Sequence, residues 1–518
     1  MIEFLCGQAS LPWPSLGSAM RLWCNAPFRA SRFLNQRMRL PFSRRCRVMW
    51  GAATLVALAG CATPPPAAPP LEHIAPPAWI APLPHAGSAV ALADWWRAAG
   101  DATLTELLDA ALQDNPSLAA AEARVAQARA QVGSQRAGLL PQVGAAASAS
   151  RGNAGGVGST PPGVDPPVAT TLQAGVQASW EIDLFGRQRA LVNAASARAE
   201  GAQALAHLAR VALVGDVAST YHGLRLCQAL LDTARQDLAS RFETARLALI
   251  SRDAGFTAPA TAALAEASAA DGRSRTTQQQ AACDVQRKAL VALTGLPEPD
   301  IEQKMAVAQM QQAPAALFSI ASLPADTLRQ RPDVWAAERE VLAARAEIVS
   351  ADAARWPGLS LGGNIGALQL RAGGATRDFS TWQFGPLQLS LPIFDGGRIA
   401  AGQAAARARY DEAVANYQGQ VRQAVQEVET ALTQGAAARA READARAAVA
   451  GYRQQFAATE ALYRQGMANL PQLEEARRNL LVSEITLAQL LNDQQAAGVA
   501  LYRAAGGGWQ VPAGGAAP

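Results

Sequence analysis

Apolar and polar residues alternate strictly along residues 171–183. The apolar positions are Leu172, Ala174, Val176, Ala178, Trp180 and Ile182. Glutamine, glycine, serine and acidic residues occupy the positions between them. A two-residue period with one apolar and one hydrogen-bonding face predicts a β-strand. Residues 381–394 alternate as well, with a change of phase at Pro386 that predicts a bulge, because proline cannot donate to a strand ladder.

Each of these strands leads through a Gly-Arg pair into a helical pattern of unusual length. Residues 187–252 and 397–465 contain no proline, and each could form a helix on the order of 100 Å long. A heptad seam follows Tyr410, Val414, Tyr417, Val421, Ala424, Val428 and Ala431. Each stretch ends at a glycine, Gly255 or Gly466, and a second helical pattern follows. These features predict two long coiled-coil hairpins, whose returning helices should cover residues 259–294 and 471–505.

The chain contains two copies of one unit. Pro116, Glu122 and Pro141 recur 216 residues later, whereas Gly186 and Gly255 recur 211 residues later. Each copy reads as a helix, a strand pair and a long hairpin. The other two strands are expected at residues 142–150 and 359–368. The expected domains are a first repeat at 93–295, an inter-repeat segment at 296–325, a second repeat at 326–508 and a flexible tail at 509–518.

Four two-faced strands cannot close a barrel by themselves, and lipid does not tolerate open sheet edges. Several chains must therefore pool their strands, and their helices must form a tube next to the barrel. The expected fold class is a mainly α-helical chain with a membrane β-barrel, assembled from duplicated strand pairs and coiled-coil hairpins. Leu172, Val176, Trp180 and Ile182 should then face lipid, and the polar positions between them should line the bore.

The N-terminal region has the features of a targeting signal. An apolar run at residues 48–60 follows several arginines, is too short to span a bilayer and is typical of a signal peptide. Leu58-Ala59-Gly60-Cys61 resembles a bacterial lipobox, so we expect residues 1–60 to be removed and Cys61 to carry a lipid anchor. An ordinary signal peptide with an incidental cysteine is the alternative.

Two further expectations concern this region. Met38 would give a signal of ordinary length, which makes residues 1–37 a hypothetical extension upstream of the true start. Residues 61–92 are rich in proline and lack periodicity, so they predict an extended tether.

Composition excludes several function classes. The first 60 residues hold eight arginines and one acid, so 38 basic and 41 acidic residues remain and the formal charge of +4 becomes −3. Nucleic-acid binding therefore has no electrostatic basis. The four histidines lack a second ligand at metal spacing, and no catalytic Ser–His–Asp or Cys–His set can be assembled. The turn at Asp395-Gly396-Gly397-Arg398 lacks the lysine and glycine spacing of a phosphate loop. We expect no enzyme activity and no cofactor apart from the lipid on Cys61.

Several local patterns together resemble the TolC-like outer-membrane efflux factors, in particular the lipoprotein branch that serves resistance–nodulation–division pumps. The patterns are Asp94-Trp95-Trp96, residues 107–116, Arg331-Pro332-Asp333-Val334, Trp356-Pro357-Gly358-Leu359 and residues 391–398. The resemblance implies a homotrimer with a barrel of about twelve strands and a periplasmic α-barrel. It also implies an equatorial region built partly from the inter-repeat segment, and partnership with a periplasmic adaptor and an inner-membrane pump.

In that family the hairpin tips close the tube with acidic side chains. Gln472 and Glu475 occupy positions that are often acidic in relatives, and Thr261 replaces the usual aspartate of the first tip. The tip at Gly255 and Gly466 is therefore expected to form the gate, with an altered charge network. Arg464 and Glu475 are its candidate ions. The alternative is that both are solvated helix-turn residues.

Cys227 and Cys283 lie at equal sequence distances from Gly255. An antiparallel hairpin would place them at similar height, and the periplasm is oxidising. A disulfide is one expectation, and a pair of reduced core cysteines is the other, because helix phase decides whether the side chains meet.

The leading prediction is a passive outer-membrane duct of a tripartite efflux system that exports drugs and toxic amphipathic compounds. An exit duct for secreted polypeptides is the alternative within the channel class. A periplasmic adaptor, which also has coiled-coil hairpins, is the alternative from another class, but adaptors do not need lipid-facing strands.

Overall fold

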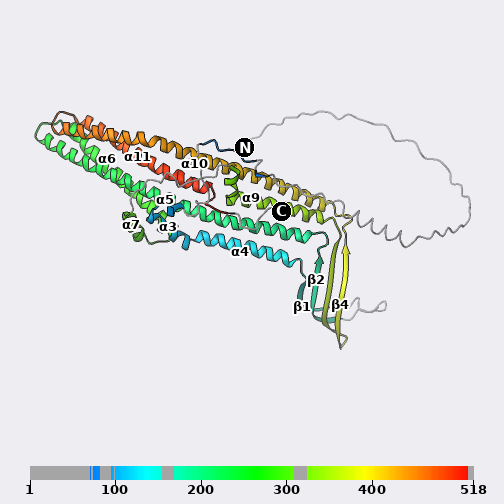
Figure 1. Cartoon of the computed structure of the whole chain (residues 1–518). Helices are drawn as coiled ribbons and strands as arrows, with labels where there is room; N and C mark the ends of the chain where they lie inside the picture. The colour runs from blue at the N-terminus through cyan, green and yellow to red at the C-terminus, as the bar shows by residue number, and fades with distance from the viewer. Residues whose placement is uncertain are drawn as a thin grey trace, which may run out of the picture. The chain divides into compact units, whose positions relative to one another are not determined.

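A computed structural model describes residues 70–71, 74–81, 95–98, 100–153, 168–307 and 324–510 (Figure 1). The predicted signal region, the lipidation site Cys61 and the last eight residues lie outside these ranges. Part of the predicted tether lies within them, and it is docked on a helix: the backbone N–H of Ala81 donates to the Glu429 carboxylate at 2.8 Å.

The element order repeats, as the duplication predicts. The first repeat contains α2 (Trp95–Ala98), α3 (Ala102–Gln113), α4 (Pro116–Ala137), β1 (Gln142–Asn153), β2 (Val168–Ile182), α5 (Arg187–Asp253) and α6 (Pro259–Thr294). The second contains α9 (Pro332–Ala353), β3 (Gly358–Ala372), β4 (Ala375–Ser390), α10 (Arg398–Arg464) and α11 (Leu470–Ala504). Between them lie α7 (Glu298–Val307) and α8 (Pro324–Arg329). None of the described helices combines the length and apolarity needed to cross a membrane.

The four strands form one antiparallel sheet in the order β1-β2-β3-β4. The predicted bulge is present, because Gly362 of β3 lies opposite both Gly385 and Pro386 of β4. The predicted bounds of the second strand pair are wrong. Both strands extend to a two-residue turn at Gly373 and Gly374, whose φ angles of 57° and 82° favour glycine, and β4 ends at Ser390 rather than at residue 394.

The helices next to the sheet follow the same order as the strands. α4 packs on α5, α5 on α9 and α9 on α10, and Figure 1 shows these four helices side by side. Towards the hairpin tips, α6 packs on α5, and α11 packs on both α10 and α5. The packed helices of one chain therefore form a layer, which we call the wall. In this wall α6 continues the line of α4, and α11 continues the line of α9; we call each of these two lines a column.

The predicted heptad seam of α10 is buried at Tyr410, Tyr417, Val421, Ala424, Val428 and Ala431, and Val414 is half-buried. Its packing partner changes along the helix. The first half packs on α9, through residues such as Val341 and Ile348, and the second half packs on Leu501 of α11. The heptad spacing predicted the buried face of α10 but not the change of partner, because spacing shows which face is buried and not what covers it.

Candidate functional site

One face of the sheet is apolar over most of its length. The register pairs Val176 of β2 with Ala145 of β1 and Ile365 of β3, and Ile365 pairs with Trp382 of β4. Residues directly opposite in an antiparallel sheet point to the same side, so this row crosses all four strands. Neighbouring rows on that side add Leu172, Trp180, Ile182, Leu361, Phe384 and Leu387. Ile365 is 65% exposed and Trp382 78% exposed in the single chain, as an outward surface requires.

The other face carries hydrogen-bonding groups and glycine. Gln177 of β2 pairs with Gly144 of β1 and Asn364 of β3, and Asn364 pairs with Gln383 of β4. The alternation predicted for β2 thus extends to the other strands in these rows. Towards the Gly373-Gly374 turn it reverses in β3, where Gln369 lies opposite Leu172 and Leu368 lies opposite Gln173. Contact of the apolar face with lipid stays a prediction, since the single chain exposes both faces.

Matching joints connect the sheet to the long helices. Gly186 and Gly397 adopt left-handed backbones with φ of 76° and 90°, directly before α5 and α10. Before each glycine an aspartate accepts a helix N–H: Asp183 from Arg189 at 3.0 Å and Asp395 from Ile399 at 2.8 Å. The hydrogen bonds from the backbone N–H groups of Ile399 and Gly397 lower the pKa of Asp395. Each joint is therefore a strand-to-helix turn in which an aspartate accepts a hydrogen bond from the first turn of the helix.

Both hairpin tips turn at the predicted glycines. Gly255 and Gly466 have φ of 78° and 74°, the conformation that ends a helix with a left-handed residue. Thr261 lies in the first turn of α6 and is half-buried.

The polar residues predicted for the gate at the second tip interact with near neighbours in the sequence or with solvent. Gln472 forms a capping box with Asn469: each side chain accepts the other's backbone N–H at 2.9 Å. Arg464 forms an exposed ion pair with Glu460 at 3.1 Å, one turn earlier on the same helix, and Glu475 is exposed. The capping role explains glutamine at position 472 without a gate. Gating roles for the tip residues stay predictions.

A buried charge cluster above the tips was missed by the sequence reasoning. Arg241 of α5 pairs with Asp237 at 2.7 Å and with Glu474 of α11 at 3.2 Å. Arg477 of α11 also pairs with Glu474 and donates to Thr244 of α5 at 2.9 Å. Arg241 and Arg477 are 7% and 3% exposed, so the cluster joins the two hairpins inside the wall. The available signal was the heptad run Leu470, Leu473, Arg477 and Leu480, which places an arginine in the seam.

Two junctions join helices end to end within their columns. The Asn115 side chain, before α4, donates to the carbonyl of Leu293 in α6 at 2.9 Å. Arg331, before α9, donates to the carbonyl of Ala504 in α11 at 2.8 Å. Arg331 is buried and also binds Asp333 at 2.6 Å and Glu427 at 2.8 Å. Through Arg331, the Arg-Pro-Asp-Val motif thus connects α9 to both α10 and α11.

Burial and charge pairing shift the pKa values at this second junction. Burial alone would raise the pKa of Asp333, but the hydrogen bond and charge of Arg331 lower it below its ordinary value. Burial lowers the pKa of Arg331, but the hydrogen bonds and charges of Asp333 and Glu427 raise it above its ordinary value. Both groups therefore stay charged at neutral pH.

Cys227 and Cys283 meet in the structure. Their sulfur atoms are joined at 2.15 Å and their Cα atoms lie 5.4 Å apart, linking α5 to α6. The helix phase that the sequence left open therefore points the two side chains together.

The described residues contain no group of His, Cys, Asp and Glu that could hold a metal ion. Burial lowers the pKa of His222 to about 4, which keeps the ring neutral. The His222 ring packs within the helices, edge-on against Tyr221.

Comparisons with known proteins agree with this architecture. A family model described as outer membrane efflux protein matches residues 107–296 and 323–507, which are parts of both repeats. Outer membrane protein OprJ of Pseudomonas aeruginosa is 34% identical over 82% of this chain and 88% of its own length. The solvent efflux pump outer membrane protein SrpC of Pseudomonas putida is 31% identical over 79% of this chain and 86% of its own. The crystal structure of the Campylobacter jejuni CmeC outer membrane channel covers 82% of this chain and 90% of its own, with a TM-score of 0.75 at 26% identity. This chain therefore belongs to the outer membrane efflux protein family, which confirms the resemblance found in its sequence motifs.

Proposed function

We propose that three copies of this chain form an outer-membrane channel through which a tripartite efflux system exports drugs and other toxic amphipathic compounds. The relatives SrpC and OprJ, named as a solvent efflux pump component and an outer membrane protein, support this substrate class and location. A periplasmic adaptor and an inner-membrane pump would complete the system. The lipid anchor at Cys61 is part of the proposal.

The observation that supports the proposal concerns the edges of the chain. Within the described residues, the sheet and the row of helices next to it both end, without a partner, on the same two sides. β1 and β4 are the unpaired edges of the sheet, and α4 and α10 are the outer members of the helix layer. Unpaired edges cannot face lipid. If β4 of one chain pairs with β1 of the next, α10 of that chain meets α4 of the next, and both layers close together. A head-to-tail contact of this kind generates a ring.

In this ring the polar sheet face lines the bore and the apolar face meets lipid. The chain itself supplies no chemical step, so the pump provides the energy. Exposed apolar side chains near the first tip, such as Phe256 and Ile250, offer a surface for the adaptor.

A susceptibility assay tests the exported class. We expect a deletion strain to become more sensitive to several unrelated amphipathic antibiotics, and plasmid expression of the chain to restore resistance. Unchanged susceptibility together with loss of a secreted polypeptide would instead favour the protein-export duct. Unchanged susceptibility and unchanged secretion would count against both channel functions.

Cysteine crosslinking tests the ring. Ala147 of β1 and Ser380 of β4 lie in one row across the sheet, at opposite edges. We expect the A147C/S380C double variant to give dimer and trimer bands with a bifunctional maleimide, whereas each single variant should stay monomeric. Monomer bands alone from the double variant would rule out pairing of these two edges in this register, since the strands of a barrel are staggered.

A further inference from the structure

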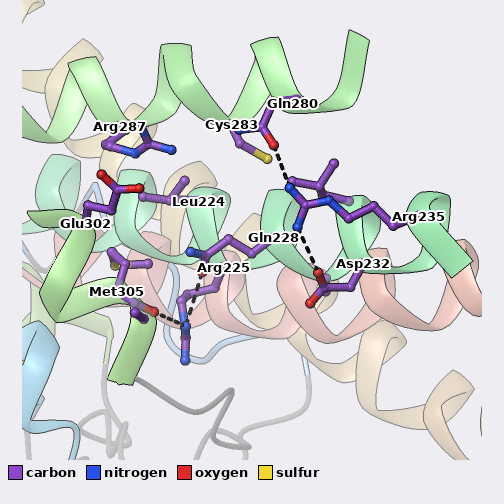
Figure 2. Close-up of a pocket in the computed structure, with 13 residues that line it drawn as sticks. Leu224, Arg225, Gln228, Asp232, Arg235, Gln280, Cys283, Arg287, Glu302 and Met305 are labelled. Atoms are coloured by element: carbon purple, nitrogen blue, oxygen red, sulfur yellow. Dashed lines mark hydrogen bonds and ion pairs between the residues drawn. The ribbon is translucent and has the colours of Figure 1, made fainter. Parts of the chain in front are cut away.

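A cavity of about 450 Å³ lies between α5, α6 and α7 (Figure 2). Arg225 and Arg235 line it from α5, Arg287 and Cys283 from α6, and Glu302 and Met305 from α7. It belongs neither to the sheet nor to the hairpin tips, and the proposed channel function gives it no role.

Two of its three arginines already have carboxylate partners. Arg235 lies 3.6 Å from Asp232 and donates to Gln280 at 2.8 Å. Arg287 pairs with Asp284 at 2.9 Å. The positive charge of these two side chains is thus largely balanced locally.

Arg225 is different. Its Nη1 donates to the Gln228 side chain and to the carbonyl of Met305, both at 3.2 Å. Both acceptors are neutral. Its Nε and Nη2 are buried and have no hydrogen-bond partner among the described residues.

Nε and Nη2 form one edge of the guanidinium, the edge that binds a carboxylate or phosphate with two parallel hydrogen bonds. Leaving charged donors buried without acceptors is costly. A change of the Arg225 rotamer would give up the two Nη1 hydrogen bonds, both to neutral acceptors. An acceptor inside the cavity would therefore favour a rotamer that directs this edge into it.

We propose that this cavity binds a small oxyanion, a carboxylate or a phosphate, through the Nε/Nη2 edge of Arg225. Leu224 and Met305 give room for a short carbon skeleton. The bound anion would link α7 to the first hairpin at the height of the Cys227–Cys283 pair. The proposal does not depend on the exported substrate.

Isothermal titration of the full chain in detergent at low ionic strength tests the site, with inorganic phosphate and citrate as separate probes. We expect at least one probe to bind, and Arg225→Gln to raise its Kd about tenfold or more, because two charge-assisted hydrogen bonds are lost. Arg246→Gln is the matched control: it removes an exposed arginine of the same helix, paired with Glu243, and should leave the Kd unchanged.

Glu302→Gln keeps the test decisive if the Arg225 variant does not fold. It removes a negative charge from the cavity wall, so it should lower the Kd several-fold. Preference for phosphate or for citrate then identifies the ligand class. The proposal is overturned if neither probe binds the wild type, if Arg246→Gln weakens binding as much as Arg225→Gln, or if Glu302→Gln leaves the Kd unchanged.

Discussion

The two repeats have nearly the same backbone dimensions and different chemistry. α5 and α10 each contain 67 residues, and α4 and α9 each contain 22. α6 and α11 contain 36 and 35. The glycines at the joints and at the tips share left-handed backbones. Because corresponding helices have nearly equal lengths, the two repeats can pack side by side. The duplication has therefore retained the backbone geometry.

The junctions within the two columns show the difference. A neutral amide, Asn115, joins α4 to α6, whereas a buried guanidinium with two carboxylate partners joins α9 to α11. The helices around them differ in the same way. Only Ala121 of α4 is buried, against nine residues of α9. α9 lies between α5 and α10, while α4 lies at an edge.

The comparison teaches that the place of a column within the single chain, and not descent from one repeat, goes with its stabilising chemistry. An interior column is dry and can hold a charge network, since a low dielectric strengthens paired charges and penalises unpaired ones. An edge column in the single chain faces water, where such a network contributes little.

The largest effect is expected at the interior junction. Arg331→Ala leaves Asp333 buried without its cation and should destabilise the fold by about 3–5 kcal/mol. Chemical denaturation followed by far-UV circular dichroism measures the loss. Arg464→Ala removes an exposed pair and should cost less than about 1 kcal/mol. Similar losses for the two variants would contradict the assigned difference between interior and surface charges.

The disulfide distinguishes the first hairpin from the second. Cys227 and Cys283 enclose a loop with a sequence separation of 56, and replacing both by serine should destabilise the hairpin by about 2–4 kcal/mol. Hydrogen exchange should then increase in the parts of α5 and α6 near the tip and stay unchanged in α10 and α11. Two accessible thiols in the denatured, unreduced wild type would show that the bond is absent.

In the sheet the repeats should behave alike, because the apolar row crosses both. Val176→Asp and Ile365→Asp each place a carboxylate on the face predicted to meet lipid, at a cost of roughly 1–3 kcal/mol, and should lower the yield of assembled trimer in the outer membrane. Gln177→Asp changes the polar face and should be tolerated. Equal yields for Val176→Asp and Gln177→Asp would mean that the faces are assigned wrongly.

At the edge junction the effect should be smaller. Asn115→Ala removes the bond to Leu293 and the cap that Asn115 provides to Ser117, and should cost about 1–2 kcal/mol. Asn115→Ser keeps an uncharged capping oxygen and removes the amide donor of the junction bond, so denaturation midpoints of the two variants separate the contributions. A loss as large as that of Arg331→Ala would remove the contrast between the columns.

The smallest effect is a pH dependence confined to the second junction. A carboxyl whose folded pKa is lowered stabilises the fold above its unfolded pKa and loses this contribution as pH falls through the folded value. Asp333 is such a group, so the protection of amides at the start of α9 against hydrogen exchange, relative to the unfolded chain at the same pH, should fall below about pH 4. The start of α4 has no equivalent carboxyl pair and should change less, and Asp333→Asn should abolish the difference.

Much of this architecture follows from local sequence patterns. Alternation at Leu172–Ile182 identified a two-faced strand, and the absence of proline with heptad spacing identified the long helices. The bulge at Pro386 and the turns at Gly255 and Gly466 follow from what proline and glycine backbones can adopt. Such patterns report one residue's relation to its near neighbours, and they are sufficient for element type and buried face.

The tertiary structure alone decided which element covers each buried face. The α10 seam passes from α9 to α11, Arg331 reaches Ala504, and Arg477 meets Arg241 and Glu474 across the two hairpins. The cavity at Arg225 and the one apolar face over four strands have the same origin. Each joins residues far apart in the chain, and a periodic pattern carries no information about its partner. Partner choice depends on shape and charge across the assembled wall, which is where this protein's two similar repeats become different.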